Sequence, residues 1–147
     1  MSSIQSQFLD LSARHDRYDE IDPRTALKNS ADGKVIFIAG ASRGIGRATA
    51  VAFAEAGAKA IYVTARGEDA LKETQALIKA ANPETLCSYA MCDVTKAAEV
   101  EAAVADCVLT FGGIDAADAN AGYLGPWVKI GESDPAGWWR NWEVNVQ

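Results

Sequence analysis

Short apolar runs alternate with longer amphipathic segments from Lys34 onward. The apolar runs have strand length and predict four strands, over residues 35–39, 59–64, 86–91 and 114–120. The segments between them carry apolar residues at helical spacing and predict three helices, over residues 44–56, about 68–81 and about 95–111. Asp134 and Pro135 have the residue types of an N-cap and a first-turn proline, so we expect a fourth helix that begins there and contains the last residues of the chain.

This alternation of strands and helices predicts an α/β fold, with a parallel sheet covered by helices on both faces. Right-handed crossovers of this length predict the strand order 3-2-1-4. That order is one half of a three-layer doubly wound (Rossmann-like) sheet, and we expect the carboxyl-terminal strands of the full sheet to be missing from this chain. Ligands of such sheets bind at the carboxyl ends of the strands, where the strand order reverses. Gly40 follows the first strand and Asn120 ends the fourth, so both fall at this reversal.

Residues 1–32 precede the alternating pattern and contain few apolar anchors. Pro23 and the segment 29–33 interrupt regular structure on the approach to the first strand. We therefore expect a leader over 1–32, which is either flexible or docked on the surface, for example through a short helix near residues 8–11. The folded domain is expected over 33–147.

The composition, with 49% apolar and 23% charged residues among 147, is typical of one globular domain. A net charge of −6 argues against non-specific binding of nucleic acid, which requires clustered basic residues. The longest apolar runs are too short to span a membrane, and the polar start lacks the apolar region of a secretion signal. We expect a soluble, cytoplasmic protein that binds neither nucleic acid nor membrane.

The cysteines and the single histidine carry no predicted chemistry. Cys87, Cys92 and Cys107 are odd in number, lack metal-ligand spacing and lie in apolar surroundings, so we expect buried free thiols and no metal site. His15 lies in the polar leader without a carboxylate or thiol constellation, and we expect a surface residue.

The turn between the first strand and the first helix is rich in glycine, and its context is that of a diphosphate-binding turn. Gly40 permits a tight bend, Gly44 allows close approach of a phosphate, and Gly46 allows close packing of the helix against the strand. The alternative is an ordinary loop, which the strand before it and the helix after it disfavour. The predicted cofactor-binding residues of this turn are Gly40, Ser42, Arg43, Gly44, Ile45 and Gly46.

The end of the second strand predicts which dinucleotide binds. An acidic side chain there would accept hydrogen bonds from a ribose 2′-hydroxyl, but Thr64-Ala65-Arg66 contains no acid. Arg66 and Arg43 together suit a 2′-phosphate, so NADP(H) is favoured and NAD(H) is the alternative. Arg66 facing solvent or stacking on adenine remains open. The same lack of an acid opposes methyl transfer with S-adenosylmethionine.

The spacing of the turn, with three residues between Gly40 and Gly44 and one between Gly44 and Gly46, resembles the short-chain dehydrogenase/reductase family. This resemblance covers residues 34–147 and implies a Rossmann-like dinucleotide-binding domain. It also implies that the parent protein is an oxidoreductase that reduces a carbonyl or oxidises an alcohol.

Further segments match motifs of that family. Asp93 closes the third strand and is suited to accept from the adenine amino group, with Val94 covering the ring, or to cap the next helix; the resemblance favours adenine. Residues 118–122 resemble the family's Asn-Asn-Ala-Gly motif with alanine replacing the first asparagine. The resemblance therefore implies cofactor contacts from Asn120, Ala121 and Gly122. Asp118 departs from the apolar residue usual there, and either an edge strand or a partner must accommodate its charge.

The resemblance also implies what this chain lacks. Asn145 matches the asparagine of the family's Asn-Ser-Tyr-Lys catalytic tetrad, but none of the four tyrosines is followed by a lysine four residues later. In the family, that pair and the serine lie beyond the matched segment. We therefore expect the amino-terminal, cofactor-binding part of an oxidoreductase, inactive in hydride transfer by itself. The alternative is a non-catalytic nucleotide-binding or interaction module.

The last predicted helix has a broad apolar side made by Trp138, Trp139, Trp142 and Val146. We expect this side to pack on the sheet or to form a homo-oligomer through residues 134–147. A substrate cage is the less favoured alternative.

Overall fold

The computed structural model describes residues 17–146. The expectations for residues 8–11 and for His15 lie outside the described residues. The strands are β1 (Val35–Ala39), β2 (Ala60–Ala65), β3 (Leu86–Met91) and β4 (Ala116–Ala119), and the α-helices are α1 (Gly44–Glu55), α2 (Glu68–Ala81), α3 (Ala97–Phe111) and α4 (Pro135–Asn145). Residues 17–146 also contain two short 3-10 helices, η2 (Asp19–Ile21) and η3 (Ile130–Glu132).

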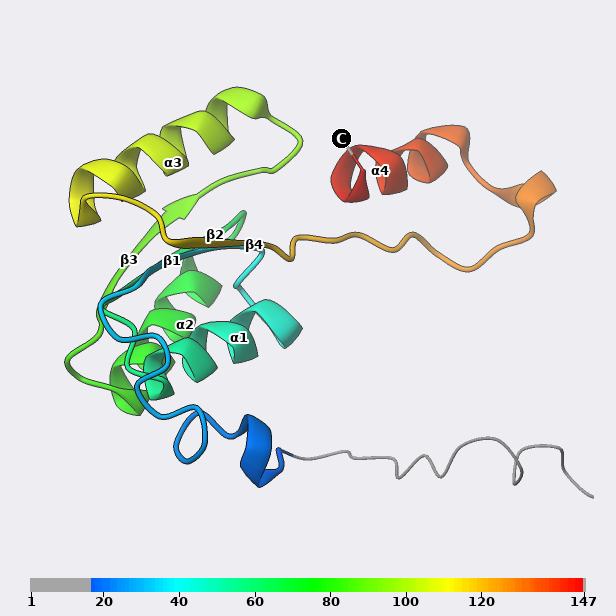
Figure 1. Cartoon of the computed structure of the whole chain (residues 1–147). Helices are drawn as coiled ribbons and strands as arrows, with labels where there is room; N and C mark the ends of the chain where they lie inside the picture. The colour runs from blue at the N-terminus through cyan, green and yellow to red at the C-terminus, as the bar shows by residue number, and fades with distance from the viewer. Residues whose placement is uncertain (1–16, 147) are drawn as a thin grey trace, which may run out of the picture.

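The four strands form one parallel sheet in the order β3-β2-β1-β4, as the sequence predicts. Helices α1 and α2 cover one face of this sheet and α3 covers the other, which makes three layers (Figure 1). The chain is therefore a doubly wound α/β fold, and the reversal of strand order lies between β1 and β4.

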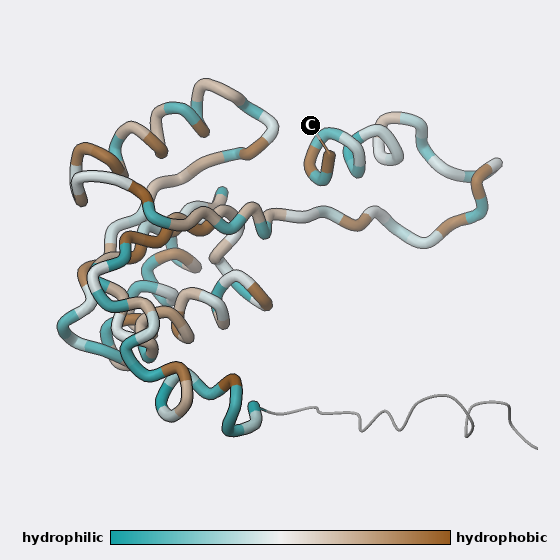
Figure 2. The backbone as a smooth tube through the Cα atoms, in the orientation of Figure 1, coloured by the Kyte–Doolittle hydropathy of each residue, from teal (hydrophilic) through white to brown (hydrophobic). Residues whose placement is uncertain are grey.

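Alternate residues of the central strands divide between two hydrophobic clusters, one on each face of the sheet. Ile36 and Ile38 of β1 pack with Leu71 and Ile78 of α2 in the larger cluster. Phe37, the residue between them, belongs to the second cluster together with buried residues of α3. Because strand side chains alternate, the nearly continuous apolar runs supply both cores. The hydropathy-coloured backbone shows apolar residues gathered along these strands (Figure 2).

Among the described residues, β4 pairs with β1 on one side and has no strand on the other, so it lies at the edge of this four-stranded sheet. Asp118 is half-buried there, whereas the remaining residues of β4 are exposed. An edge position was one of the two expected explanations for a carboxylate in this strand, and the observed topology supports it. The strand is also shorter than the predicted range 114–120. Asp115 precedes it, and its carboxylate accepts the Val35 amide hydrogen at 2.8 Å.

The third predicted helix begins two residues later than expected. Asp93 and Thr95 form a side-chain-supported turn, and α3 starts only at Ala97. Its end is as predicted, since Gly112 adopts the left-handed conformation with φ of +90° directly after Phe111. The second strand is displaced by one residue from the predicted range.

Helix α4 follows a long extended connection and lies apart from the helices that cover the sheet (Figure 1). The Asp134 carboxylate caps it by accepting the Gly137 amide hydrogen at 2.7 Å, and Pro135 occupies the first turn, as predicted. No helix in the described range 17–146 is long and apolar enough to cross a membrane.

The described part of the leader contacts the C-terminal end of α1 and the residues that follow it. Arg17 forms an ion pair with Glu55 of α1, and the Ala31 amide donates to the Ala56 carbonyl at 3.1 Å. Asp32 and Ala58 form an isolated antiparallel bridge just before β1.

Candidate functional site

A cleft of about 310 Å³ opens at the carboxyl ends of the strands, where the strand order reverses. All the predicted cofactor-binding residues except Gly46 line it: Gly40, Ser42, Arg43, Gly44, Ile45, Arg66, Asp93, Val94, Asn120, Ala121 and Gly122. The fold thus brings together segments that follow all four strands. The cleft is also lined by residues that the sequence analysis did not select: Ala65, Cys92, Tyr123, Arg140 and Val144.

The glycine turn is anchored to both neighbouring strands. The amides of Gly40 and Ala41 donate to the Thr64 carbonyl at 2.8 and 3.0 Å. The Asn120 side-chain amide donates to the Gly40 carbonyl at 2.9 Å. Gly40 itself has φ of +83°, a conformation that strongly favours glycine. The turn therefore depends on contacts from β2 and from the end of β4.

A second set of contacts ties the turn to α2. The buried Thr74 hydroxyl donates to the Ala41 carbonyl at 2.9 Å. Arg47 donates to the Ser42 carbonyl, to the Thr74 hydroxyl at 3.0 Å and to Glu73 at 3.0 Å. These bonds satisfy the carbonyl groups of Ala41 and Ser42 in the turn.

Gly46 is buried in the first turn of α1, against Gly40 and Asn120. A Cβ at this position would stand 2.4 Å from Nδ2 of Asn120 and 2.5 Å from the Gly40 carbonyl oxygen. Neither distance is compatible with a side chain. The expected role of Gly46, close packing of helix against strand, is the arrangement in the structure.

The N-terminus of α1 opens into the cleft without a side-chain cap. Arg43 is the N-cap residue, and its side chain makes no capping hydrogen bond. The first-turn amides of an α-helix lack intrahelical acceptors and carry the positive end of the helix dipole. The first turn of α1 contains no acidic residue, and a Cβ on Gly44 would meet nothing within 4 Å. This space suits an anionic group.

The charges around the cleft come from distant parts of the chain. Arg43 and Arg66 are both exposed on its wall, the first from the glycine turn and the second from the end of β2. Arg140 reaches it from α4. Asp93, from the end of β3, is the acidic residue among the lining side chains.

Asp93 is held by the turn that follows β3. Its Oδ1 accepts hydrogen bonds from the Thr95 amide at 3.1 Å and from the Thr95 hydroxyl at 2.8 Å. These bonds, with smaller contributions from the charges of Arg140 and Arg66, hold the pKa of the Asp93 carboxyl below its ordinary value, and desolvation opposes them. Asp93 does not cap α3, whose N-cap residue is Lys96.

Asn145 lies outside this cleft. Both polar atoms of its side chain bind the Tyr123 backbone, with Oδ1 accepting the amide hydrogen at 2.9 Å and Nδ2 donating to the carbonyl at 2.8 Å. One turn earlier, Oδ1 of Asn141 accepts the Gly125 amide hydrogen at 2.9 Å. The two asparagines thus attach α4 to the segment that leaves β4.

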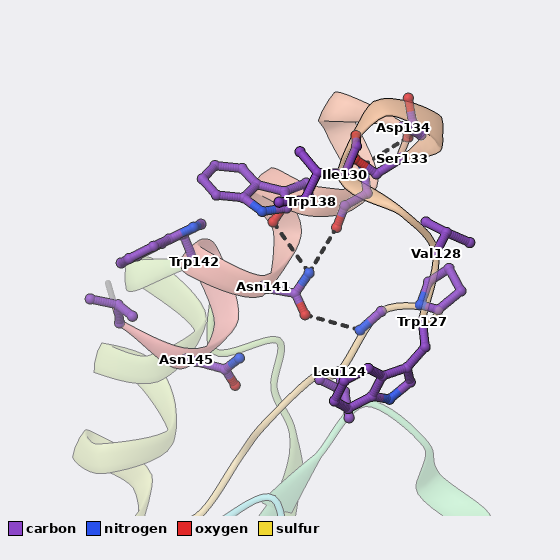
Figure 3. Close-up of a pocket in the computed structure, with 14 residues that line it drawn as sticks. Leu124, Trp127, Val128, Ile130, Ser133, Asp134, Trp138, Asn141, Trp142 and Asn145 are labelled. Atoms are coloured by element: carbon purple, nitrogen blue, oxygen red, sulfur yellow. Dashed lines mark hydrogen bonds between the residues drawn. The ribbon is translucent and has the colours of Figure 1, made fainter.

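A second cavity of about 590 Å³ lies between this segment and α4, and Asn145 lines it (Figure 3). Its walls are mainly apolar and include Trp138 and Trp142, whose ring centroids are 5.8 Å apart. About half the surface of each of these tryptophans is exposed, at 52% and 47%. The expected broad apolar side of α4 is therefore present and is only partly covered by the described residues.

The described residues contain no group of three histidine, cysteine or acidic side chains that would hold a metal. Cys92 and Cys107 are buried free thiols, as expected, whereas Cys87 is only partly buried. Burial raises the pKa of the Cys87 thiol to about 11, so this group is protonated at neutral pH.

Sequence reasoning missed Arg47, Thr74, Tyr123 and Arg140. Thr74 had a usable signal, because it occupies the apolar side of α2 between Leu71 and Ile78, where a polar residue requires an internal partner. Arg140 had none, since its proximity to the cleft depends on how the connection after β4 returns the chain.

The model of a protein family described as short chain dehydrogenase matches residues 34–147. The chain is 40% identical over 126 residues to short chain dehydrogenase mpl6 of Monascus purpureus, across 84% of this chain and 43% of that protein. It is 37% identical over 133 residues to short chain dehydrogenase tazN of Aspergillus terreus, across 90% of this chain and 28% of that protein. The chain thus spans less than half the length of these curated relatives.

Solved structures of dehydrogenases and reductases are also similar to this chain. NAD⁺-bound xylitol dehydrogenase superposes with a TM-score of 0.74 at 32% identity, covering 79% of this chain and 44% of the other. Levodione reductase superposes with a TM-score of 0.75 at 30% identity, covering 78% and 44%. An NADH-dependent reductase complexed with NAD has a TM-score of 0.70 at 29% identity, covering 80% and 48%.

Replacing Gly46 with alanine is expected to destabilise the domain by about 1–3 kcal/mol, because the new methyl group collides with Asn120 and with the Gly40 carbonyl. Gly113→Ala is the matched control, since a Cβ at Gly113 would meet nothing within 4 Å. Urea unfolding measures both variants. Equal stability of the two variants would contradict the packing role of Gly46.

Asp93→Asn is expected to lower stability at neutral pH and to lose that effect in acid. Folding lowers the pKa of this carboxyl, so its contribution is fully present above the ordinary value of 3.8 and disappears as the pH falls through the lowered pKa. Urea unfolding between about pH 6 and pH 2.5 should show the gap between wild type and variant closing toward acid. A gap independent of pH would refute this assignment.

Proposed function

The chain belongs to the short-chain dehydrogenase family, and on that premise we propose that its cleft binds NADP(H) for an oxidoreductase that reduces a carbonyl or oxidises an alcohol. The chain spans only 43% of the length of mpl6, so the reaction belongs to the longer protein and the cofactor cleft to this chain. The observation that carries the proposal is the glycine turn, whose helix amides open into a cleft at the reversal of strand order.

The residues fit a dinucleotide in three zones of the cleft. The turn from Gly40 to Gly46 would receive the diphosphate on the amides of the first turn of α1. Asp93 and Val94 would receive adenine. Asn120, Ala121 and Gly122 would border the ribose on the nicotinamide side. The bound cofactor would supply the hydride in carbonyl reduction or accept it in alcohol oxidation.

The choice of NADP(H) rests on the charges beside the end of β2. Arg66 follows this strand directly, and Arg43 lines the same wall. Two guanidinium groups suit a 2′-phosphate, and the strand end carries no acid to accept ribose hydroxyls. NAD(H) is the alternative, since two of the similar solved structures contain NAD.

We propose that Asn145 contributes by positioning. Its side chain uses both polar atoms on the Tyr123 backbone and so holds the segment that borders the nicotinamide end of the cleft. The tyrosine and lysine that the family uses for proton transfer have no counterpart at the required spacing in these 147 residues.

A non-catalytic nucleotide-binding or interaction module is the second candidate. The exposed aromatic side of α4 favours it, since Trp138, Trp139 and Trp142 are each about half exposed, at 52%, 57% and 47%. Such a surface suits association through residues 134–147, including a homo-oligomer.

Calorimetry with NADPH and NADH tests the cofactor proposal. Arg66→Asp should weaken NADPH binding by about 10- to 100-fold, because charge-assisted hydrogen bonds to the 2′-phosphate are lost, and should affect NADH far less. Lys28→Asp makes the same charge change on the exposed leader and should leave both affinities within about twofold. Equal losses of both cofactors in Arg66→Asp would remove the argument for NADP(H).

Turnover assays separate the two candidate functions. The purified chain should bind NADPH but should not consume it with a panel of aldehydes and ketones, because the proton-transfer pair is lacking. Adding the remaining half of a full-length relative should restore NADPH consumption if the chain is an oxidoreductase part. NADPH consumption by the chain alone would refute the proposal that catalysis requires the longer protein. NADPH binding without restored consumption would favour the non-catalytic module.

A further inference from the structure

Arg140 connects α4 to the wall of the cleft. Its Nη2 lies 4.0 Å from Oδ2 of Asp93, and its guanidinium carbon lies 5.8 Å from the centroid of the Tyr123 ring. The side chains of Arg140 and Asp93 are 37% and 21% exposed, so the pair is partly shielded from water. Three segments far apart in the sequence therefore meet at this guanidinium.

The two oxygens of Asp93 have different partners. Thr95 supplies two hydrogen bonds to Oδ1, and Arg140 is the ion-pair partner of Oδ2. Glu99 is the other carboxylate at this corner. It accepts the Asp93 amide hydrogen at 2.8 Å and pairs with Lys96 at 2.7 Å, so its charge is already compensated. Asp93 is thus an ionised carboxylate whose nearest compensating cation is Arg140.

An ionised Asp93 affects the other cations of the cleft. Arg66 lines the same cleft, and its positive charge is among those that lower the Asp93 pKa, so the two groups interact electrostatically. An uncompensated carboxylate would attract Arg66 and would repel a phosphate brought next to that arginine. Because the positive charge of Arg140 lies beside it, Asp93 attracts Arg66 less strongly and repels a nearby phosphate less strongly.

We propose that Arg140 determines cofactor specificity by neutralising Asp93, which leaves Arg43 and Arg66 free for the 2′-phosphate of the dinucleotide. This inference rests on the proposed function, because it concerns the phosphate that distinguishes NADP(H) from NAD(H). The preference for NADP(H) over NAD(H) would then depend on a residue of α4 as well as on the residues at the end of β2.

The position of α4 does not depend on Arg140. Asn141 and Asn145, one helical turn apart, bind the backbone of Gly125 and Tyr123, which are two residues apart in an extended segment. A helical turn of four residues and two extended residues each advance by about 6 Å, so the two spacings match. Removing the Arg140 charge should therefore leave the helix attached.

The test is the ratio of NADPH to NADH affinity, measured by calorimetry in wild type and variants. Arg140→Gln should lower this ratio about fivefold at low ionic strength, and the effect should shrink as salt is added. Arg140→Lys should retain most of the ratio because it keeps the charge. The double variant Asp93→Asn with Arg140→Gln should recover the wild-type ratio, since no carboxylate then needs compensation. Any contact of Asp93 with adenine is common to both cofactors and cancels in the ratio.

Lys129→Gln is the control, because it removes one cation from an exposed ion pair near α4 but outside the cleft, and it should leave the ratio unchanged. Circular dichroism melts verify that each variant is folded. An unchanged ratio in Arg140→Gln, or no recovery in the double variant, overturns this inference while leaving the cofactor proposal intact. Wild-type protein that binds neither dinucleotide, or prefers NADH, overturns the NADP(H) proposal and this inference with it.

Discussion

The structure depends on the close approach of α1 to the ends of β1 and β4. At Gly46, the Gly40 carbonyl and the Asn120 side-chain amide lie so close to the helix that no Cβ would fit. This contact sets the direction of α1, so that its uncapped N-terminus opens into the cleft. The suitability of the cleft for an anionic group follows from that direction, because the free helix amides and the helix dipole act only over the first turn.

The rest of the fold holds this contact in place. The glycine turn receives hydrogen bonds from Asn120 after β4, from Thr74 on α2 and from Arg47 on α1, and its own amides reach the β2 carbonyl of Thr64. Two separate apolar clusters, one on each face of the sheet, support the strands from which these groups extend. The turn is therefore positioned by tertiary contacts, and these contacts also fix the first turn of α1, whose amides a ligand would meet.

Net charge and local charge differ in this molecule. The chain carries a formal charge of −6, yet Arg43, Arg66 and Arg140 line a cleft in which Asp93 is the acidic residue. Helices α2 and α3 carry exposed acidic residues, whereas Arg43 and Arg66 follow the ends of β1 and β2 and Arg140 reaches the cleft from α4. For a family whose cofactor is a nicotinamide dinucleotide, this local balance matters more than the overall charge, because screening confines electrostatic effects to nearby groups.

The sequence by itself determined the strand order, the doubly wound topology, the glycine turn and most of the cleft. Apolar runs of strand length, helical spacing and turn residues are local signals, and the handedness of crossovers converts them into one topology. Only the tertiary structure decided the late start of α3, the place of β4 at the edge of the described sheet, the hydrogen bonds of Thr74 and the ion pair of Arg140 with Asp93. These features depend on contacts between residues that are distant in sequence, either across the sheet or through the connection to α4. The periodicity of the sequence does not predict such contacts.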